Sequence, residues 1–84
     1  MPRIQLEDFT AKIYLEDHHP PHVHVENARK TGEVKVRLDH GGKSEAISQG
    51  GKISKREVKR AEELVRENEA ILWATWEDIQ RRKK

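Results

Sequence analysis

Four of the five histidines in this 84-residue chain lie within seven consecutive positions. An imidazole ring binds divalent metals and exchanges protons near neutral pH, so a cluster of this kind suits either chemistry. The sequence therefore predicts that any chemical site of the protein lies here. The segment reads His18-His19-Pro20-Pro21-His22-Val23-His24.

The residues after the two prolines alternate between polar and apolar, as in an extended strand. Successive side chains of a strand point to opposite faces, so we expect His22, His24 and Glu26 on one face. Val23 and Val25 would then occupy the other face. The Cα atoms of the two histidines would be about 6–7 Å apart, a separation that one metal ion can bridge.

Pro20 and Pro21 predict a stiff turn, because proline lacks an N–H, has a fixed φ and is excluded from helix interiors and central strands. Across this turn His18 could approach the histidines of the strand. The expected cofactor is zinc or another divalent metal, bound by nitrogen and oxygen ligands only, since the chain has no Cys. A turn whose imidazoles only hydrogen-bond to carbonyls and carboxylates is the structural alternative. The predicted metal ligands are His18, His22, His24 and Glu26.

The same strand face could support acid–base chemistry without a metal. His22 and His24 could move protons to and from RNA oxygens, while Lys35 and Arg37 stabilise a phosphorane. These four residues are the predicted catalytic groups if the protein is an enzyme, which the sequence leaves open. The alternative is the ordinary polar outer face of an antiparallel sheet. The chain has no cysteine nucleophile and no glycine-rich phosphate-binding loop, which disfavours thiol and nucleotide hydrolase chemistry.

Composition indicates one small domain, residues 1–84, with a thin core, because 33% of the residues are hydrophobic and 38% are charged. We therefore expect a small protein partner, or a second copy of the chain bound through the C-terminal helix. No apolar run approaches the roughly 20 residues of a membrane span, so no membrane partner is expected. The expected location is the cytoplasm.

Basic residues concentrate in residues 52–60 and 81–84, although the net charge is only +2. Such segments can contact phosphate groups. Charge blocks more often form solvated surfaces, so nucleic acid is an alternative partner and not the favoured one.

Alternating apolar residues predict a β-meander over about residues 3–48. Residues 3–16 should form two short strands, the second around Ile13 and Leu15. The histidine strand at 22–26 and a strand at 33–38 would follow, with a weak edge strand at Ala46 and Ile47. A short connection at residues 49–52 would end the sheet.

The hydrophobic period changes to that of a helix at Ser54, and the helical segment covers about residues 54–82. Ser54 and Glu57 have the spacing of a capping box. We favour one long helix, because no Gly or Pro interrupts it, over two consecutive helices with Asn68 as a cap. Trp76 should fill the core, whereas Trp73 lies off the apolar stripe. The predicted stripe contains Val58, Ala61, Leu64, Val65, Ile71, Leu72, Trp76 and Ile79.

The predicted fold class is thus α+β, with an antiparallel meander of three to five strands covered by a C-terminal amphipathic helix. One of its faces would be apolar and the other polar.

The chain resembles a small bacterial family described as a domain of unknown function, DUF4160. The resemblance rests on the start Met1-Pro2-Arg3-Ile4, on Lys12-Ile13-Tyr14, on the histidine–proline segment and on Leu72 and Trp76. Val23 departs from the family motif, which commonly has an aromatic residue there. The resemblance implies no established reaction. It implies a component of a toxin–antitoxin-like pair, encoded beside a second small gene, whose histidine turn is the functional site.

Overall fold

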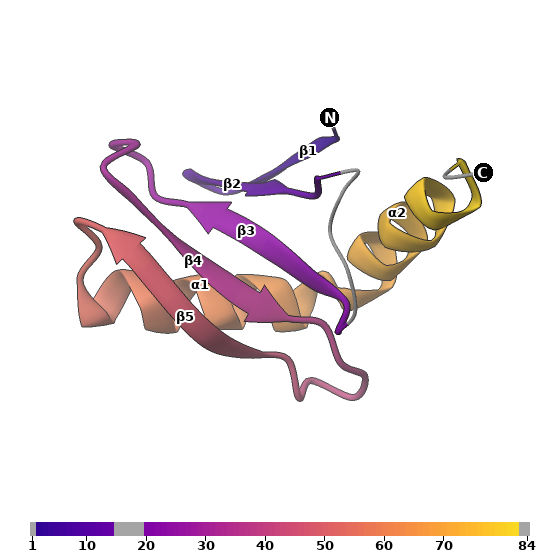
Figure 1. Cartoon of the computed structure of the whole chain (residues 1–84). Coiled ribbons are helices and arrows are strands. Elements are labelled where there is room, and N and C mark those ends of the chain that lie inside the picture. The colour runs from indigo at the N-terminus through magenta and orange to yellow at the C-terminus, as the bar shows by residue number, and fades with distance from the viewer. Residues whose placement is uncertain (1, 15–19, 83–84) are drawn as a thin grey trace.

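A computed structural model describes residues 2–14 and 20–82 and has the α+β fold predicted from the sequence (Figure 1). Five strands precede two helices. The strands pair in chain order, β1-β2-β3-β4-β5, and every neighbouring pair is antiparallel. The elements are β1 (Arg3–Leu6), β2 (Phe9–Lys12), β3 (His22–Glu26), β4 (Gly32–Arg37), β5 (Glu45–Gly51), α1 (Lys55–Glu67) and α2 (Glu69–Arg82).

Helix α1 covers one face of the sheet and lies behind β4 and β5 in the view of Figure 1. Strands β3 and β4 send two valines each to this covered face, and all four side chains are fully buried. The register pairs Val23 with Val36 and Val25 with Val34, so the branched side chains lie opposite one another across the two strands. The helices complete the core with Ala61, Leu64, Val65, Leu72, Trp76 and Ile79.

Helix α1 begins with the predicted capping box. The Ser54 hydroxyl accepts the Glu57 N–H at 3.1 Å, and the Glu57 carboxylate accepts the Ser54 N–H at 2.9 Å. The hydrogen bond from the Ser54 backbone is the largest cause that lowers the pKa of Glu57 below its usual value. The sequence therefore predicted both the start of α1 and the capping box that stabilises it.

The preference for one long helix was wrong, because the helical segment divides at Asn68. This residue has φ −121° and ψ 21°, and its amide donates to the Leu64 carbonyl at 2.7 Å. The side chain thereby occupies a carbonyl near the end of α1. The next residue, Glu69, receives hydrogen bonds from Gly42 and Ser44 in the β4–β5 loop, which fixes the start of α2.

Two apolar residues of the helical segment differ from expectation. Ile71 was predicted on the buried stripe but is 53% exposed. The buried positions of α2 begin at Leu72, and consecutive helical residues differ by about 100° in direction, so Ile71 points away. Trp73 is partly buried, donates its Nε1–H to the Asp39 carbonyl at 2.9 Å and stacks on His40. Trp76 is buried in the core, as predicted.

The second and fifth strands also differ from the predicted bounds. The turn after β1 contains only residues 7–8, with Glu7 at φ 57°, so β2 begins earlier than predicted and ends before Ile13. Leu15 lies outside the described residues. Strand β5 reaches Gly51, where a connection was predicted, and the β4–β5 register shifts between Lys35 and Val36, which leaves Ile47 as an extra, bulged residue.

Candidate functional site: the open face of the sheet

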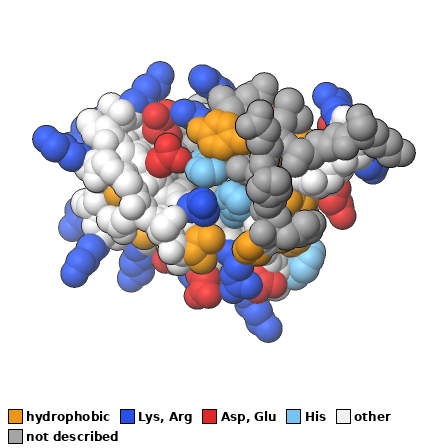
Figure 2. All heavy atoms as spheres, viewed as in Figure 1, with side chains coloured by type: hydrophobic (Ala, Val, Ile, Leu, Met, Phe, Trp, Pro, Cys, Tyr) orange, Lys and Arg blue, Asp and Glu red, His pale blue; other side chains and the backbone are white. Residues whose placement is uncertain are grey.

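The face of the sheet opposite α1 carries the histidines. Figure 2 shows this face, with histidine side chains near its middle and basic and acidic side chains around them. The predicted strand places His22 and His24 together on it: the centroids of the two rings are 5.2 Å apart. Val23, between the two histidines, and Val25, which follows them, lie in the core. The predicted division of β3 into two faces is therefore confirmed.

His22 is held by the proline turn and by α2. Its Nδ1 lies 2.8 Å from the Pro20 carbonyl oxygen, and its ring centroid lies 6.0 Å from that of the buried Trp76. The Pro21 carbonyl accepts the Leu38 N–H at 2.9 Å, which fastens the turn to the residue after β4. A carbonyl oxygen can only accept, so Nδ1 of His22 carries a proton and Nε2 is the basic nitrogen of the neutral ring.

His24 is oriented by a carboxylate. Its Nδ1 lies 2.9 Å from Oε2 of Glu33 on β4, and an ionised carboxylate likewise only accepts. The ring also packs edge-on against Tyr14, with the centroids 4.6 Å apart. The two neighbouring strands place Lys12 and Lys35 opposite His24. His24 therefore has the same tautomer as His22 in its neutral form, with a carboxylate in place of the carbonyl.

Two of the other predicted site residues, Glu26 and Arg37, have ionic partners of their own. The Glu26 carboxylate lies 3.2 Å from the Lys12 ammonium group. The Arg37 guanidinium lies 3.1 Å from Glu45 and 3.7 Å from Asp39. Arg37, a predicted catalytic cation, thus joins the end of β4 to the start of β5 through its ion pairs.

Within residues 2–14 and 20–82, no group of three or more metal-binding side chains is arranged to hold one ion. His18 lies outside these residues, so the predicted ligand set of His18, His22, His24 and Glu26 stays a prediction. The structure brings together the rings of His22 and His24 and gives each ring an oxygen acceptor at Nδ1.

Glu33 is the site residue that sequence reasoning missed. The register pairs Glu26 with Glu33 and His24 with Lys35, so Glu33 is the diagonal neighbour of His24. Two glutamates directly opposite repel each other unless each has a cation or a donor, and here Lys12 and His24 fill these roles. The signal lies in the strand register, which the alternation of residue types alone does not specify.

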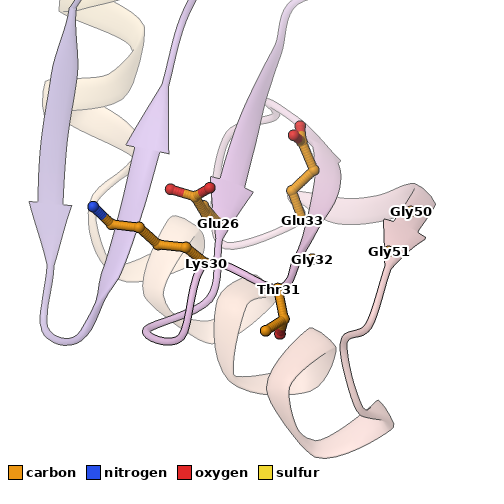
Figure 3. A pocket seen from close by; sticks show the side chains of 7 residues that line it. All are labelled: Glu26, Lys30, Thr31, Gly32, Glu33, Gly50 and Gly51. Atoms are coloured by element: carbon orange, nitrogen blue, oxygen red, sulfur yellow. The ribbon is translucent and has the colours of Figure 1, made fainter.

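A hollow of about 390 Å³ lies at the Glu33 end of the open face. Figure 3 shows Glu26 on β3 and Glu33 on β4 beside it, with Lys30 extending from the loop that joins these strands. The Glu33 carboxylate both lines the hollow and bonds to His24, so the histidine pair and the hollow share a wall. The lining residues are Glu26, Lys30, Thr31, Gly32, Glu33, Gly50 and Gly51.

These observations define a small α+β protein with one sheet face covered by α1 and an opposite face, the open face, on which two oriented and largely buried histidines lie. The chain belongs to the family described as a domain of unknown function, DUF4160, whose profile matches residues 9–77. No curated protein and no solved structure is significantly similar to it. Neither α1 nor α2 has the length and apolar character needed to cross a bilayer.

Proposed function

We propose that this is a cytoplasmic bacterial protein that binds a divalent metal ion through Nε2 of His22 and of His24. The observation that carries the proposal is the pair of oxygen acceptors at Nδ1, the Pro20 carbonyl and the Glu33 carboxylate. Histidines that bind metals almost always donate the other ring N–H to a carbonyl or a carboxylate, which fixes the tautomer and the ring direction. Both rings of this pair have that arrangement.

The separation of the rings supports the same function. Two imidazole nitrogens that bind one tetrahedral ion at about 2.0–2.1 Å place their ring centroids roughly 5 Å apart. The centroids of His22 and His24 are 5.2 Å apart. His18 is the third ligand expected from the sequence, with Glu26 as a further one after it leaves Lys12. Zinc is the first candidate, because a nitrogen and oxygen ligand set suits it.

Metal content of the untagged protein, purified without chelator and measured by mass spectrometry, tests this site. We expect close to one zinc or other divalent ion per chain in the wild type, and loss of most of it in His22→Ala/His24→Ala. The matched control is His40→Ala, because His40 stacks on Trp73 and contacts neither ring of the pair in the ring contacts of the described residues. Equal metal content in the control and the double variant, or none in the wild type, would contradict the proposal.

We further propose that the open face is where a small protein partner binds, in a toxin–antitoxin-like pair. The polar and charged side chains around the histidines support this assignment. The test is co-expression with the product of the adjacent small gene, followed by size-exclusion chromatography. A one-to-one complex that weakens in His22→Ala/His24→Ala would support it, and co-elution that is unchanged by the double variant would place the contact elsewhere. A dimer through α2, where Ile71 is exposed, is a second arrangement that the same elution volumes would reveal.

RNA cleavage is the second candidate function, and the His24–Glu33 pair favours it. The Glu33 carboxylate orients the ring of His24, and Lys35 lies directly opposite His24, so a proton-transfer group and a cation are adjacent. His22, Lys35 and Arg37 would supply the acid and the charge stabilisation. Cleavage of a labelled RNA that survives EDTA and disappears in His24→Ala would establish this function in place of a metal site.

A further inference from the structure

A second surface, which we name the basic surface, lies where the loop between β3 and β4 meets the residues before α1. Two segments far apart in sequence form it: the loop between β3 and β4 and the start of α1. The Thr31 hydroxyl donates to the Lys52 carbonyl at 2.8 Å, and the Lys52 N–H donates to the Thr31 carbonyl at 2.8 Å. Asn27 adds a hydrogen bond to the same Lys52 carbonyl at 3.2 Å. The basic surface consists of Arg29, Lys30, Lys52, Lys55, Arg56 and Lys59.

All six side chains of the basic surface are exposed. Lys55, Arg56 and Lys59 lie in the first turns of α1, and Lys59 is four positions from Lys55 and three from Arg56, spacings at which helical residues are neighbours. The close crossing of the two segments keeps the loop cations beside them: a Cβ at Gly51 would lie 2.6 Å from the Thr31 carbonyl oxygen, so only glycine fits there. The fold thus converts a run of basic residues in one segment into a broader cationic surface.

The charges of the basic surface are not neutralised from within. Among the described residues, only Arg29 of the six has an ion pair, with Glu57 at 3.4 Å. Three arginines outside the surface, Arg37, Arg60 and Arg82, each lie within 4 Å of a carboxylate. The capping box occupies the N–H groups of Ser54 and Glu57 at the start of α1.

We propose that the basic surface binds the phosphate backbone of double-stranded nucleic acid without reading its sequence. Flexible lysines suit a regular row of phosphates, which they can contact without fixed geometry. The two exposed large apolar residues of the described chain, Ile47 and Ile71, are not part of the surface, so it lacks the apolar anchor of a membrane-binding helix. It also lacks an aromatic side chain on which an unpaired base would stack, which disfavours single strands.

Fluorescence anisotropy with a labelled 20-base-pair DNA duplex, from 50 to 200 mM salt, tests this proposal. Each phosphate contact contributes a slope of about 0.9 to the dependence of log K on log salt. We therefore expect Lys52→Gln/Lys55→Gln/Lys59→Gln to reduce the slope by about 2–3 and the affinity at 50 mM salt by at least about tenfold. The histidine pair plays no part in this binding, so His22→Ala/His24→Ala should bind the duplex as the wild type does.

The matched control removes the same charge elsewhere, with Arg3→Gln/Lys43→Gln/Arg81→Gln. We expect this control to bind almost as tightly as the wild type, and thermal unfolding followed by circular dichroism verifies that both triple variants are folded. Equal losses in the two triple variants would overturn the proposal, because only net charge would then matter. Absence of duplex binding by the wild type would also overturn it. Salt-dependent binding of poly-glutamate in place of DNA would assign the basic surface to an acidic protein.

Discussion

The two faces of the sheet are made from the same strands but place their polar groups differently. The covered face is apolar at its centre, and its buried polar residues, Asn27 and Ser44, lie at the margins, where they fasten loops to the helices. The open face has its polar groups at the centre, where His24 and Glu33 bond across two strands. Polar groups thus stabilise loop positions on one side of the sheet and orient rings on the other.

Residues of the covered face therefore contribute to the stability of the fold, whereas those of the open face orient the groups of the proposed site. A residue on the covered side matters because its removal leaves a cavity or an unpaired buried group. A residue at the centre of the open face matters because it sets the direction of a nitrogen atom. Four experiments test this division, in order of the expected change in the free energy of unfolding.

The largest change is expected from Val25→Asp. Val25 is fully buried between β2, β4 and the helices, so an aspartate there would be an unpaired buried charge. We expect a loss of about 4 kcal/mol or more, enough to unfold a small domain. The neighbouring substitution Glu26→Gln, on the opposite face, should cost less than about 1 kcal/mol. Urea denaturation measures both, and similar losses would contradict the division between the faces.

The next largest change is expected from Asn27→Ala. The side-chain oxygen of Asn27 accepts the N–H groups of Thr31 and Gly32. Its side-chain amide group donates to Thr31, Lys52 and Glu57. Removing the amide leaves buried donors and acceptors without their partner, which should cost about 2–3 kcal/mol. As a control, Thr10→Ala removes an exposed hydroxyl that donates to Gln5 and should change stability by less than about 0.5 kcal/mol.

A smaller and pH-dependent change is expected from Glu69→Gln. Burial raises the pKa of Glu69, but hydrogen bonds from the Ser44 hydroxyl and from the N–H groups of Gly42 and Ser44 outweigh it, so the pKa lies below its usual 4.5. The ionised form therefore stabilises the fold fully above about pH 4.5, and this stabilisation is lost as the pH falls through the folded pKa.

The measurement for Glu69 is the thermal midpoint of wild type and Glu69→Gln between pH 3 and pH 7. We expect the wild type to be more stable at pH 7 by about 1–2 kcal/mol, and the difference to shrink as the pH falls below 4.5. A difference that stays constant over this range would show that the carboxylate charge is not the stabilising property.

The smallest change in stability is expected from Glu33→Gln. The Glu33 side chain is partly exposed, and such pairs contribute at most about 1 kcal/mol. Its effect on the site should be much larger, since loss of a carboxylate behind a metal-binding histidine typically lowers metal affinity about 10- to 100-fold. Isothermal titration with zinc measures this effect. A large loss of stability with unchanged zinc affinity would reverse the roles of the two faces.

Much of the sheet could be predicted from the alternation of polar and apolar residues alone. The alternation of His22 to Glu26 predicted which residues of β3 face the core, and the 33–38 pattern did the same for β4, because a buried face excludes polar side chains. The capping box at Ser54 was also readable, since its two residues interact within one turn. Features set by a few neighbouring residues were therefore predictable.

Features set by distant contacts were not. The helical segment divides at Asn68 although no Gly or Pro lies there. The division coincides with hydrogen bonds from the β4–β5 loop to Glu69, and that loop lies about 25 residues earlier in the chain. The role of Glu33 depends on a register that no local pattern fixes. The ligand role of His18, by contrast, lies outside the described residues and awaits the metal measurement.

The bulge at Ile47 interrupts the edge of the sheet and has a consequence for association between copies of the chain. A long, regular edge strand offers a row of N–H and C=O groups that a second chain can extend into a fibre. In β5 the extra residue interrupts that row, and the Ala46 N–H donates to the Glu62 carboxylate of α1. This sheet protein of low net charge is thereby protected against edge-to-edge aggregation at its β5 edge.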